Sequence, residues 1–373
     1  MASNLPNEIM ADILSRLPPK SLARFRLVSK NLCSLICDSY FVSMHLNRSI
    51  ESGSSNLLLP CQYSSLLQLH TYSVDGYSFD KAHEIENPFD LSLSKYRVLG
   101  SCNGLVCFIN CDSVCLLNPS IREYKVVKFA RKFDLRHPDS MEIVYGFGYD
   151  LMDKDFKLVE IVYGNVGLES NCDFDVKITV YSLSDTSFSF STQCTTPYKI
   201  FDEQDLGIYL NGALHWTAVN KHTSIETIFS FDIGGKVFRE IPLPNSLDKL
   251  ASINAGVLQG KLCMLVKKGC MEMDIWVMRS YGVRESWSKL YSVNQPGACL
   301  GTSHCSFCFT NNGEKVILKD TSDRLLYDPI QKTVKNLEIP GVFDWKRIDK
   351  IVSHVASLIP LKSNPILGKN KQW

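Results

Sequence analysis

Residues 4–36 read NLPNEIMADILSRLPPKSLARFRLVSKNLCSLI and contain the strongest pattern in the chain. Apolar residues in the first half of this stretch recur at the three- and four-residue spacing of one helix face: Leu5, Ile9, Ile13, Leu14 and Leu17. Pro6 suits a first helical turn, where its missing N–H would have no partner anyway. Pro18 and Pro19 end the helix.

Two shorter apolar stripes follow, the first formed by Leu22, Phe25 and Val28 and the second by Leu32, Leu35 and Ile36. The pattern therefore predicts three or four short helices within about 46 residues. Helices in so short a segment enclose little interior, so a partner or the following domain must cover their apolar faces. Two interpretations remain at this point, a docking module or an ordinary helical cap on a larger domain.

The Leu-Pro start, the Arg-Leu-Pro at 16–18 and the Val-Ser-Lys at 28–30 resemble an F-box. That resemblance implies docking on the Skp1 adaptor of a cullin-RING ubiquitin ligase, with the rest of the chain selecting what is ubiquitinated. The family often has Trp where this chain has Leu32. The Skp1-binding residues implied are Leu5, Pro6, Ile9, Ile13, Leu14, Leu17, Pro18, Leu22, Phe25, Val28, Leu32, Leu35 and Ile36.

The composition favours a folded protein without a nucleic-acid or membrane partner. The chain has 373 residues, 45% hydrophobic and 21% charged, and a net charge of +1. Its apolar runs are shorter than the ~20 residues that span a bilayer, and Glu8 and Asp12 do not fit a secretory signal. We expect a soluble protein of the cytoplasm, the nucleus or both.

The fourteen cysteines do not follow the pattern of a secreted disulfide scaffold. Several lie inside strand-like apolar runs, where a thiol behaves as a small hydrophobic group: Cys102, Cys107, Cys115 and Cys263. Cys305 and Cys308, with His304 before them, form the one C-x-x-C, and no second pair accompanies it. Reduced cysteines are the preferred interpretation over zinc, and no metal or cofactor is predicted.

The chain divides into an F-box at 1–46, a polar linker at 47–56, an all-β domain at 57–361 and a basic tail at 362–373. The helical period stops after the linker, and short strands separated by turn residues take over. The linker suggests that the β domain folds without residues 1–46.

A strand–turn–strand unit recurs through the β domain. Its copies align on Tyr72, Leu117, Tyr181, Phe231, Trp276 and Tyr327, at spacings of 45 to 64 residues. Kelch-type blades are about 50 residues long, so six units predict a six-bladed β-propeller. Residues 351–359 are predicted to form a strand that closes the ring onto the first blade.

Asn-Gly and Gln-Gly pairs at 103–104, 211–212, 259–260 and 312–313 predict hairpin turns within this domain. Together with Leu117-Asn-Pro-Ser-Ile-Arg, Tyr145-Gly-Phe-Gly-Tyr-Asp and Leu210-Asn-Gly-Ala-Leu-His-Trp, they resemble the kelch-like F-box-associated domain of plant F-box proteins. True kelch repeats carry a Gly-Gly pair in each blade, whereas this chain has one, at 234–235.

Motifs for catalysis are lacking in the sequence: no nucleophile elbow, zinc-protease motif or phosphate loop is present. The glycines at 146 and 148 suit a bulge or a close strand approach, and His215 suits a buried strand position. A basic stretch follows the second repeat and is a candidate substrate-binding rim: Arg122, Lys125, Lys128, Arg131 and Lys132. Two solvated loops or strand faces are the alternative.

The leading hypothesis is a non-catalytic substrate receptor of a Skp1–cullin-1–RING ligase, which holds a protein substrate near the ubiquitin-charged enzyme. Proteasomal degradation of the substrate would follow. The rival hypothesis is a propeller that binds a glycan or a small molecule, or is an enzyme, behind a vestigial F-box. Binding to Skp1 separates the two.

Overall fold

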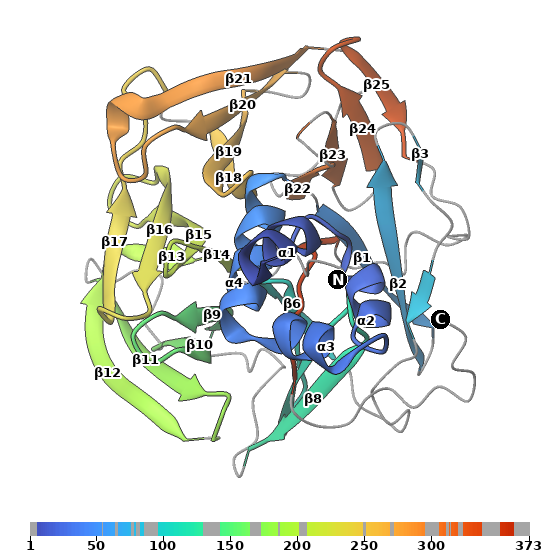
Figure 1. The fold of residues 1–373 in the computed structure, drawn as a ribbon. Helices are drawn as coiled ribbons and strands as arrows, with labels where there is room; N and C mark the ends of the chain where they lie inside the picture. Colours follow the sequence, from blue (N-terminus) through green and yellow to red (C-terminus); the bar gives the residue numbers. More distant parts are fainter. Residues whose placement is uncertain are drawn as a thin grey trace.

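The computed structural model describes residues 6–53, 55–63, 66–75, 78–79, 83–85, 96–129, 142–164, 173–185, 187–200, 207–248, 251–268, 272–294, 306–310, 313, 315–319, 324–337 and 351–361. Its N-terminal part contains the helices α1 (Asn7–Leu14), α2 (Pro19–Phe25), α3 (Lys30–Cys37) and α4 (Ser39–Glu51). None of the helices in these ranges is long and apolar enough to cross a membrane. The remainder is almost entirely β-structure (Figure 1).

Most of the predicted linker at 47–56 is helix and strand, so that prediction is wrong. Helix α4 continues to Glu51, and strand β1 begins at Ser55. Asp38 caps α4, since its Oδ1 accepts the backbone N–H groups of Tyr40 and Phe41 at 2.9 and 3.2 Å. The polar residues from 47 to 51 belong to a helix that the propeller supports on one side, because the Ile50 side chain reaches the turn at Gln259–Gly260.

The described strands form six antiparallel sheets, here called blades 1 to 6. Blade 1 contains β26 (Val352–Val355), β1 (Ser55–Tyr63), β2 (Leu66–Asp75), β3 (Ser78–Phe79) and β4 (His83–Ile85). Blade 2 contains β5 (Arg97–Cys102), β6 (Leu105–Ile109), β7 (Ser113–Asn118) and β8 (Glu123–Lys128). Blade 3 contains β9 (Glu142–Asp150), β10 (Asp155–Tyr163), β11 (Phe174–Ser182) and β12 (Phe188–Thr196).

Blade 4 contains β13 (Tyr198–Ile200), β14 (Ile208–Leu210), β15 (Ala213–Asn220), β16 (Glu226–Asp232) and β17 (Val237–Ile241). Blade 5 contains β18 (Ser252–Leu258), β19 (Lys261–Lys267), β20 (Glu272–Met278) and β21 (Trp287–Asn294), with the 3-10 turn η1 (Arg284–Ser286) before β21. Blade 6 contains β22 (Ser306–Phe309), β23 (Val316–Lys319), β24 (Arg324–Asp328) and β25 (Thr333–Asn336).

The blades close into a ring, which confirms the predicted six-bladed propeller (Figure 1). The innermost strands contact one another in turn: β26 with β5, β5 with β9, β9 with β14, β14 with β18, β18 with β22, and β22 with β26. Strand β26 from the C-terminal end pairs with β1, with Val352 opposite Leu58. The predicted closing strand is therefore confirmed, over a shorter stretch than 351–359. Closure leaves few exposed sheet edges.

The six aligned repeat residues occupy equivalent places in the ring. Each lies on the third strand of its blade counted from the axis: Tyr72 on β2, Leu117 on β7, Tyr181 on β11, Phe231 on β16, Trp276 on β20 and Tyr327 on β24. The spacing of the repeats in the sequence therefore predicted correctly where each blade lies along the chain. The unequal spacings reflect loops of different length between equivalent strands.

Apolar clusters fill the spaces between neighbouring blades. Gly146 of β9 shows how tightly blades 3 and 4 pack, since a Cβ there would lie 2.6 Å from Leu214 Cδ1 and 2.7 Å from Trp216 Cζ2. A close strand approach, one of the two predicted roles of this glycine, is what the structure has. The predicted core cysteines 102, 107, 115 and 263 are all buried.

Candidate protein-docking surface

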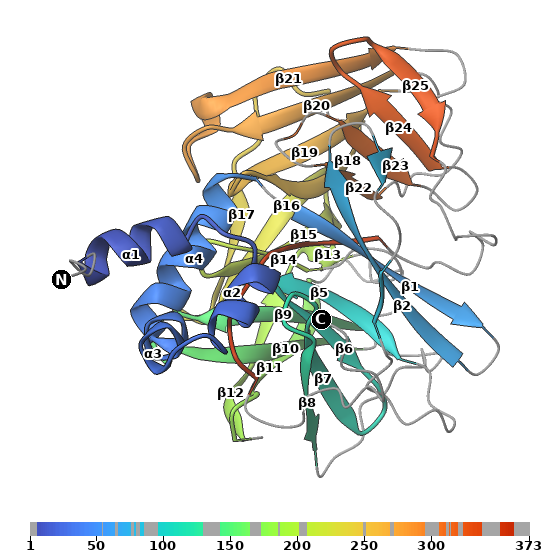
Figure 2. The same ribbon diagram turned by 45° about the vertical axis from the view of Figure 1, so that its right-hand side comes forward.

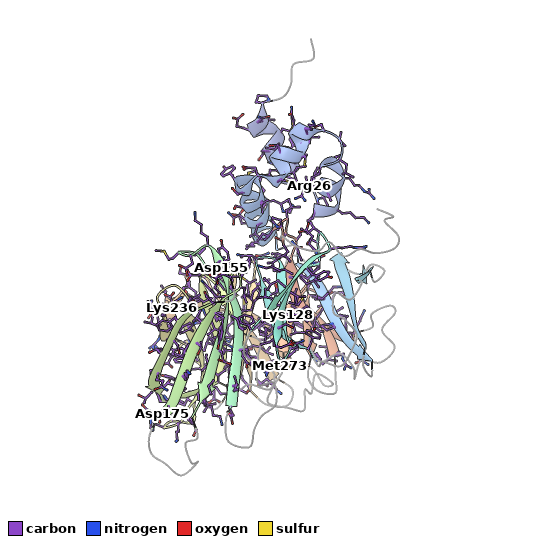
Figure 3. The ribbon with its side chains drawn as sticks, turned by 90° about the horizontal axis from the view of Figure 1, so that it is seen from below. Arg26, Lys128, Asp155, Asp175, Lys236 and Met273 are labelled. Atoms are coloured by element: carbon purple, nitrogen blue, oxygen red, sulfur yellow. The ribbon has the colours of Figure 1, made fainter. Side chains whose placement is uncertain are left out.

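The four helices sit together on one end of the propeller (Figure 2). Asp155 and Lys236 lie at this end and Asp175 at the opposite one (Figure 3). The tight turns at Asn103–Gly104 and Gln259–Gly260, with positive φ at both residues, also lie at the helical end. A Cβ on Gly104 would lie 2.2 Å from Ser357 Cβ, so the turn packs directly against the C-terminal segment.

Helix α1 has two apolar faces with different surroundings. Ile9 and Ile13, four residues apart on one face, are 48% and 50% exposed. Leu14, on the other face, is buried, and Met10 is half-buried beside it. These two half-exposed isoleucines make this face of α1 a candidate surface for a partner.

Further exposed apolar residues follow in and after α2. Phe25 is partly exposed, and Leu27 and Val28 are 83% and 69% exposed. We call Ile9, Ile13, Phe25, Leu27 and Val28 the docking surface. Leu27 is not among the predicted docking residues because it falls outside the helical stripe. The short turn at 26–28 that ends α2 exposes it.

A second apolar set joins the helices to the propeller, and we call it the seam: Leu14, Leu22, Ile36, Phe41, Val42, Ile121 and Leu358. Ile121 comes from the β7–β8 turn and Leu358 from the segment after β26. Leu14, Leu22 and Ile36 were predicted to contact an adaptor, and here the structure corrects the prediction. Their side chains are buried inside the chain, because the propeller supplies the cover that three short helices lack.

The remaining predicted docking residues fall into three groups. Pro6 and Pro18 are exposed. Leu17, Leu32 and Leu35 are partly buried against the seam. Leu5 lies outside the described residues.

Hydrogen bonds fix the C-terminal side of the seam. The buried Asn118 side chain donates through Nδ2 to the carbonyls of Ser357 at 3.2 Å and Ile359 at 2.9 Å. The backbone N–H of Leu361 donates to Glu123 Oε2 at 2.9 Å. The segment after β26 is therefore clamped to blade 2 while its apolar side chains meet the helices.

Helices α1 and α4 are joined by Arg48. Its guanidinium donates to the Asp12 carboxylate, to the Ser15 hydroxyl and to the Asp12 carbonyl, the last at 2.8 Å. The hydrogen bond from Arg48 to the Asp12 carboxylate lowers the pKa of that group. Nearby, the buried His45 ring meets the Leu17 carbonyl at 3.0 Å, and burial lowers the pKa of His45.

Comparison with known proteins shows the family to which this architecture belongs. Residues 58–359 match the family model of the F-box associated beta propeller domain, and residues 2–44 match that of the F-box domain. The chain belongs to the F-box-associated β-propeller family. It is 28% identical to F-box protein CPR1 of Arabidopsis thaliana, over 90% of this chain and 85% of that one.

A second relative is also from Arabidopsis thaliana. The F-box/kelch-repeat protein At3g23880 is 31% identical, over 87% of this chain and 88% of that one. Among solved structures, the six-bladed Aleuria aurantia lectin aligns with a TM-score of 0.38 and 12% identity, over 78% of this chain and 97% of the lectin. That similarity is too low to support an inference about function.

The basic residues predicted as a substrate rim are dispersed on this F-box protein. Arg122 lies in the turn before β8 and Lys128 at the far end of that strand, roughly 20 Å away at the usual rise per residue. Lys125 projects from the face of β8 opposite to that of Lys128, and its Nζ donates to the Leu183 carbonyl at 3.1 Å. Arg131 and Lys132 lie outside the described residues. Substrate binding by this stretch stays a prediction.

Two titratable groups of the described propeller, His215 and Cys263, are buried in its core. His215 is fully buried, meets the Tyr281 hydroxyl at 2.7 Å and the Ile208 carbonyl at 3.1 Å, and burial lowers its pKa to about 4. The prediction of a buried, hydrogen-bonded histidine is confirmed. Burial also raises the pKa of the Cys263 thiol to about 12, which keeps it protonated. The described residues contain no group of three or more side chains arranged to hold a metal.

Proposed function

We propose that this F-box protein is the substrate-recognition subunit of a Skp1–cullin-1–RING ubiquitin ligase. The docking surface binds a Skp1-like adaptor, and the propeller binds a protein substrate for ubiquitination and degradation. In this proposal the chain is not an enzyme; it acts by raising the effective concentration of the substrate near the charged ubiquitin-conjugating enzyme. It would work in the cytoplasm, the nucleus or both.

The observation that carries the proposal is the exposure of Ile9 and Ile13 on α1, and of Leu27 and Val28 in the turn after α2, while other apolar residues of the helices pack against the propeller. An F-box that served only to cap the propeller would need apolar residues at the seam alone. Exposed apolar side chains cost solubility and are typical of a surface that a partner covers. Both family matches and the two Arabidopsis relatives support the same function.

The position of the helices supports a separation of the two activities. They occupy one end of the ring, so an adaptor on the docking surface leaves the opposite end and the outer strands free (Figure 3). A substrate bound there would be held at a fixed place relative to the adaptor, because the seam joins the helices to blades 1 and 2.

The test is binding of the full chain to a purified Skp1-like adaptor, measured by calorimetry. Ile13→Asp should weaken binding at least tenfold, since burial of one such side chain contributes about 1.5–3 kcal/mol and an unpaired carboxylate in the interface adds a penalty. The matched control is Ile330→Asp, at a 79% exposed position on the β24–β25 turn of blade 6. Because both sites are exposed, both variants should fold normally.

Equal adaptor affinity for Ile13→Asp and the control would refute this use of α1. A failure of the unaltered chain to bind any Skp1-like adaptor would refute the proposed function as a whole.

A further inference from the structure

Helix α3 carries two cysteines that belong to neither the seam nor the docking surface. Cys33 and Cys37 are four residues apart, so they lie on the same side of the helix, one turn from each other. Both are free thiols, Cys33 half-buried and Cys37 exposed. A hydrogen bond joins the two side chains. The two sulfur atoms therefore form a pair that an ion from solvent can reach.

The spacing of this pair suits a bridging ion better than a disulfide. Side chains four residues apart on a helix have Cβ atoms about 5–6 Å apart, whereas a disulfide needs about 3.5–4.5 Å. A metal–sulfur bond is about 2.3 Å long, so two sulfurs on one ion are at most roughly 4.6 Å apart. Rotation of the two side chains covers that separation while the helix backbone stays in place. The same helical spacing brings the two histidines of zinc-protease motifs onto one metal.

The number and kind of ligands decide which ion fits. Thiolates are soft ligands and favour soft ions such as Cu(I). Zinc in structural sites takes four protein ligands, and the part of the chain that the structure describes has no group of three or more side chains arranged to hold a metal. A pair of thiolates suits an ion that accepts two ligands, as Cu(I) does.

Arg26 supplies a positive charge beside the pair. It lies among the four helices, at the end of α2 (Figure 3). Of the charged groups that act on Cys37, Arg26 has the largest electrostatic effect and Glu123 a smaller one. The Nε of Arg26 is buried and has no hydrogen-bond partner among the described residues. Two thiolates with one Cu(I) carry an overall negative charge, and an unpaired buried cationic N–H nearby favours such a neighbour.

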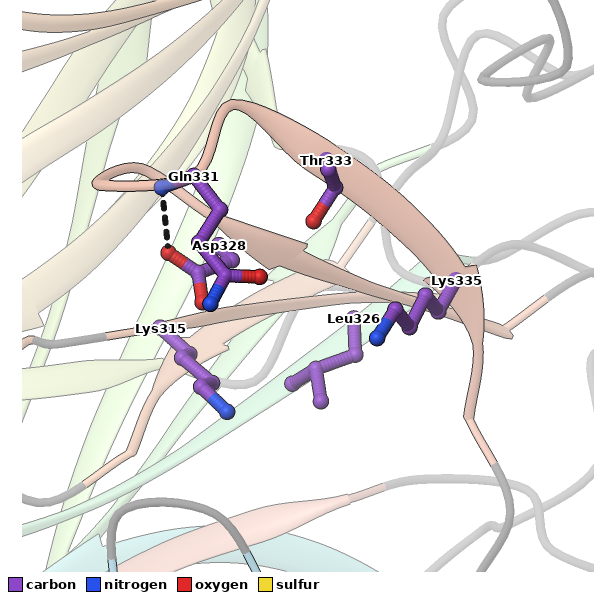
Figure 4. A pocket seen from close by; sticks show the side chains of 6 residues that line it. All are labelled: Lys315, Leu326, Asp328, Gln331, Thr333 and Lys335. Carbon is purple, nitrogen blue, oxygen red and sulfur yellow. Dashed lines mark hydrogen bonds between the residues drawn. The ribbon is translucent and has the colours of Figure 1, made fainter.

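A hollow on blade 6 offers the opposite kind of ligand. Its polar side chains present oxygen and nitrogen atoms and no sulfur: Lys315, Leu326, Asp328, Gln331, Thr333 and Lys335 line it (Figure 4). Oxygen ligands suit hard ions such as Mg²⁺ and Ca²⁺ rather than Cu(I). The thiol pair on α3 is therefore the better place for a soft ion.

We propose that Cys33 and Cys37 bind one Cu(I) ion as a pair of thiolates, with Arg26 compensating the negative charge. Each thiol releases its proton to solvent as its Cu–S bond forms, and the copper remains Cu(I) throughout. The bound ion joins two successive turns of α3. The site lies outside the docking surface, so it goes beyond the proposed function and does not depend on it.

The test titrates the full chain with Cu(I), kept reduced and buffered by a coloured chelator that competes for the ion. The chelator holds free Cu(I) too low for single thiols to bind it. Cys33→Ser and Cys37→Ser should each weaken binding at this site at least about a hundredfold, because a direct ligand matters more than a supporting residue. Arg26→Gln should weaken it about tenfold, and Arg26→Lys, which keeps the charge, by less. The control is Cys194→Ser, which removes an exposed thiol from β12.

Loss of one bound ion per chain in both α3 variants, with Cys194→Ser unchanged, supports the site. X-ray absorption of the chain loaded with one Cu(I) should show two sulfur ligands. Both serine variants keep the docking surface, so their affinity for a Skp1-like adaptor should stay within twofold of the unaltered chain. A failure of this site is therefore distinguishable from a failure of the proposed function.

Three results would overturn the proposal. The first is full retention of copper by Cys37→Ser, whose exposed position should let the variant fold normally. The second is an equal loss of copper in Cys194→Ser. The third is a copper ion with three or four sulfur ligands, since it would be bound by another set of thiols.

Discussion

Ile13 and Leu14 are neighbours in α1, yet one belongs to the docking surface and the other to the seam. Half of the Ile13 side chain remains in water, whereas Leu14 is packed among residues that include Ile121 and Leu358 of the propeller. The same apolar spacing therefore serves two purposes in this module. One face is kept for a partner, and the other ties the module to its own chain.

This difference changes how the two domains relate. A flexible linker would let the F-box carry the propeller at many angles, but α4 runs almost to β1 and the seam includes the segment after the ring-closing strand. The expectation that the propeller folds without residues 1–46 stays a prediction, and the seam bears on it. Their removal would expose Ile121, Leu358 and Ile359 beside the closure.

The largest effect is expected at Leu358. Leu358→Ala removes a fully buried side chain from the seam and should lower the free energy of unfolding by about 3 kcal/mol, within the usual range for such cavities. Ile13→Ala, on the docking surface, should change it by less than about 0.5 kcal/mol. Urea unfolding of both variants measures the contrast. Equal losses would mean that the two faces are not distinct in the free protein.

For each of two buried histidines, a somewhat smaller effect is expected from acid. Burial lowers the pKa of both His215 in blade 4 and His354 in β26 to about 4, from an ordinary value of 6.5. Each ring is neutral in the fold and gains its proton more readily in the unfolded chain. The stabilisation is complete above pH 6.5 and is lost as the pH falls toward 4, by roughly 2 kcal/mol for each histidine at pH 5.

The measurement is urea unfolding at pH 7 and pH 5 for the unaltered chain and for His354→Gln. The variant should lose the part that His354 contributes, roughly 2 kcal/mol at pH 5, while keeping the parts of His215 and of His45, whose pKa burial also lowers. An unaltered chain that is equally stable at both pH values would show that these rings are not held neutral. A buried, neutral histidine on the closing strand β26 makes closure of the propeller depend on pH. The docking surface does not share this dependence.

Sequence reasoning recovered the ring but not the seam. The blade number followed from repeated pairs of short strands, because turn residues and alternation are local signals that every blade carries. Tyr72 to Tyr327 lie on equivalent strands for that reason. Leu14 and Leu358 come from opposite ends of the chain and belong to one apolar cluster, and no local pattern in the sequence records such an arrangement.

The same limit applies to the candidate sites. Leu14 and Leu22 have the spacing of docking residues, and only the propeller beneath them shows that they are covered. The basic stretch at 122–132 looked continuous in sequence, yet strand alternation puts Lys125 and Lys128 on opposite faces of β8.

The smallest effect is expected at the cap of α4. Asp38→Ala removes the acceptor of the Tyr40 and Phe41 N–H groups and should cost about 1 kcal/mol of stability. Because Phe41 belongs to the seam, the loss should appear in urea unfolding and leave adaptor affinity within twofold of the unaltered chain. The control is Ser29→Ala, which removes a cap of the same kind from α3. There the Ser29 hydroxyl accepts one hydrogen bond, from the Leu32 N–H at 3.2 Å. If Asp38→Ala weakens adaptor binding as much as Ile13→Asp does, the seam and the docking surface act as one unit, and the separation drawn between Ile13 and Leu14 fails.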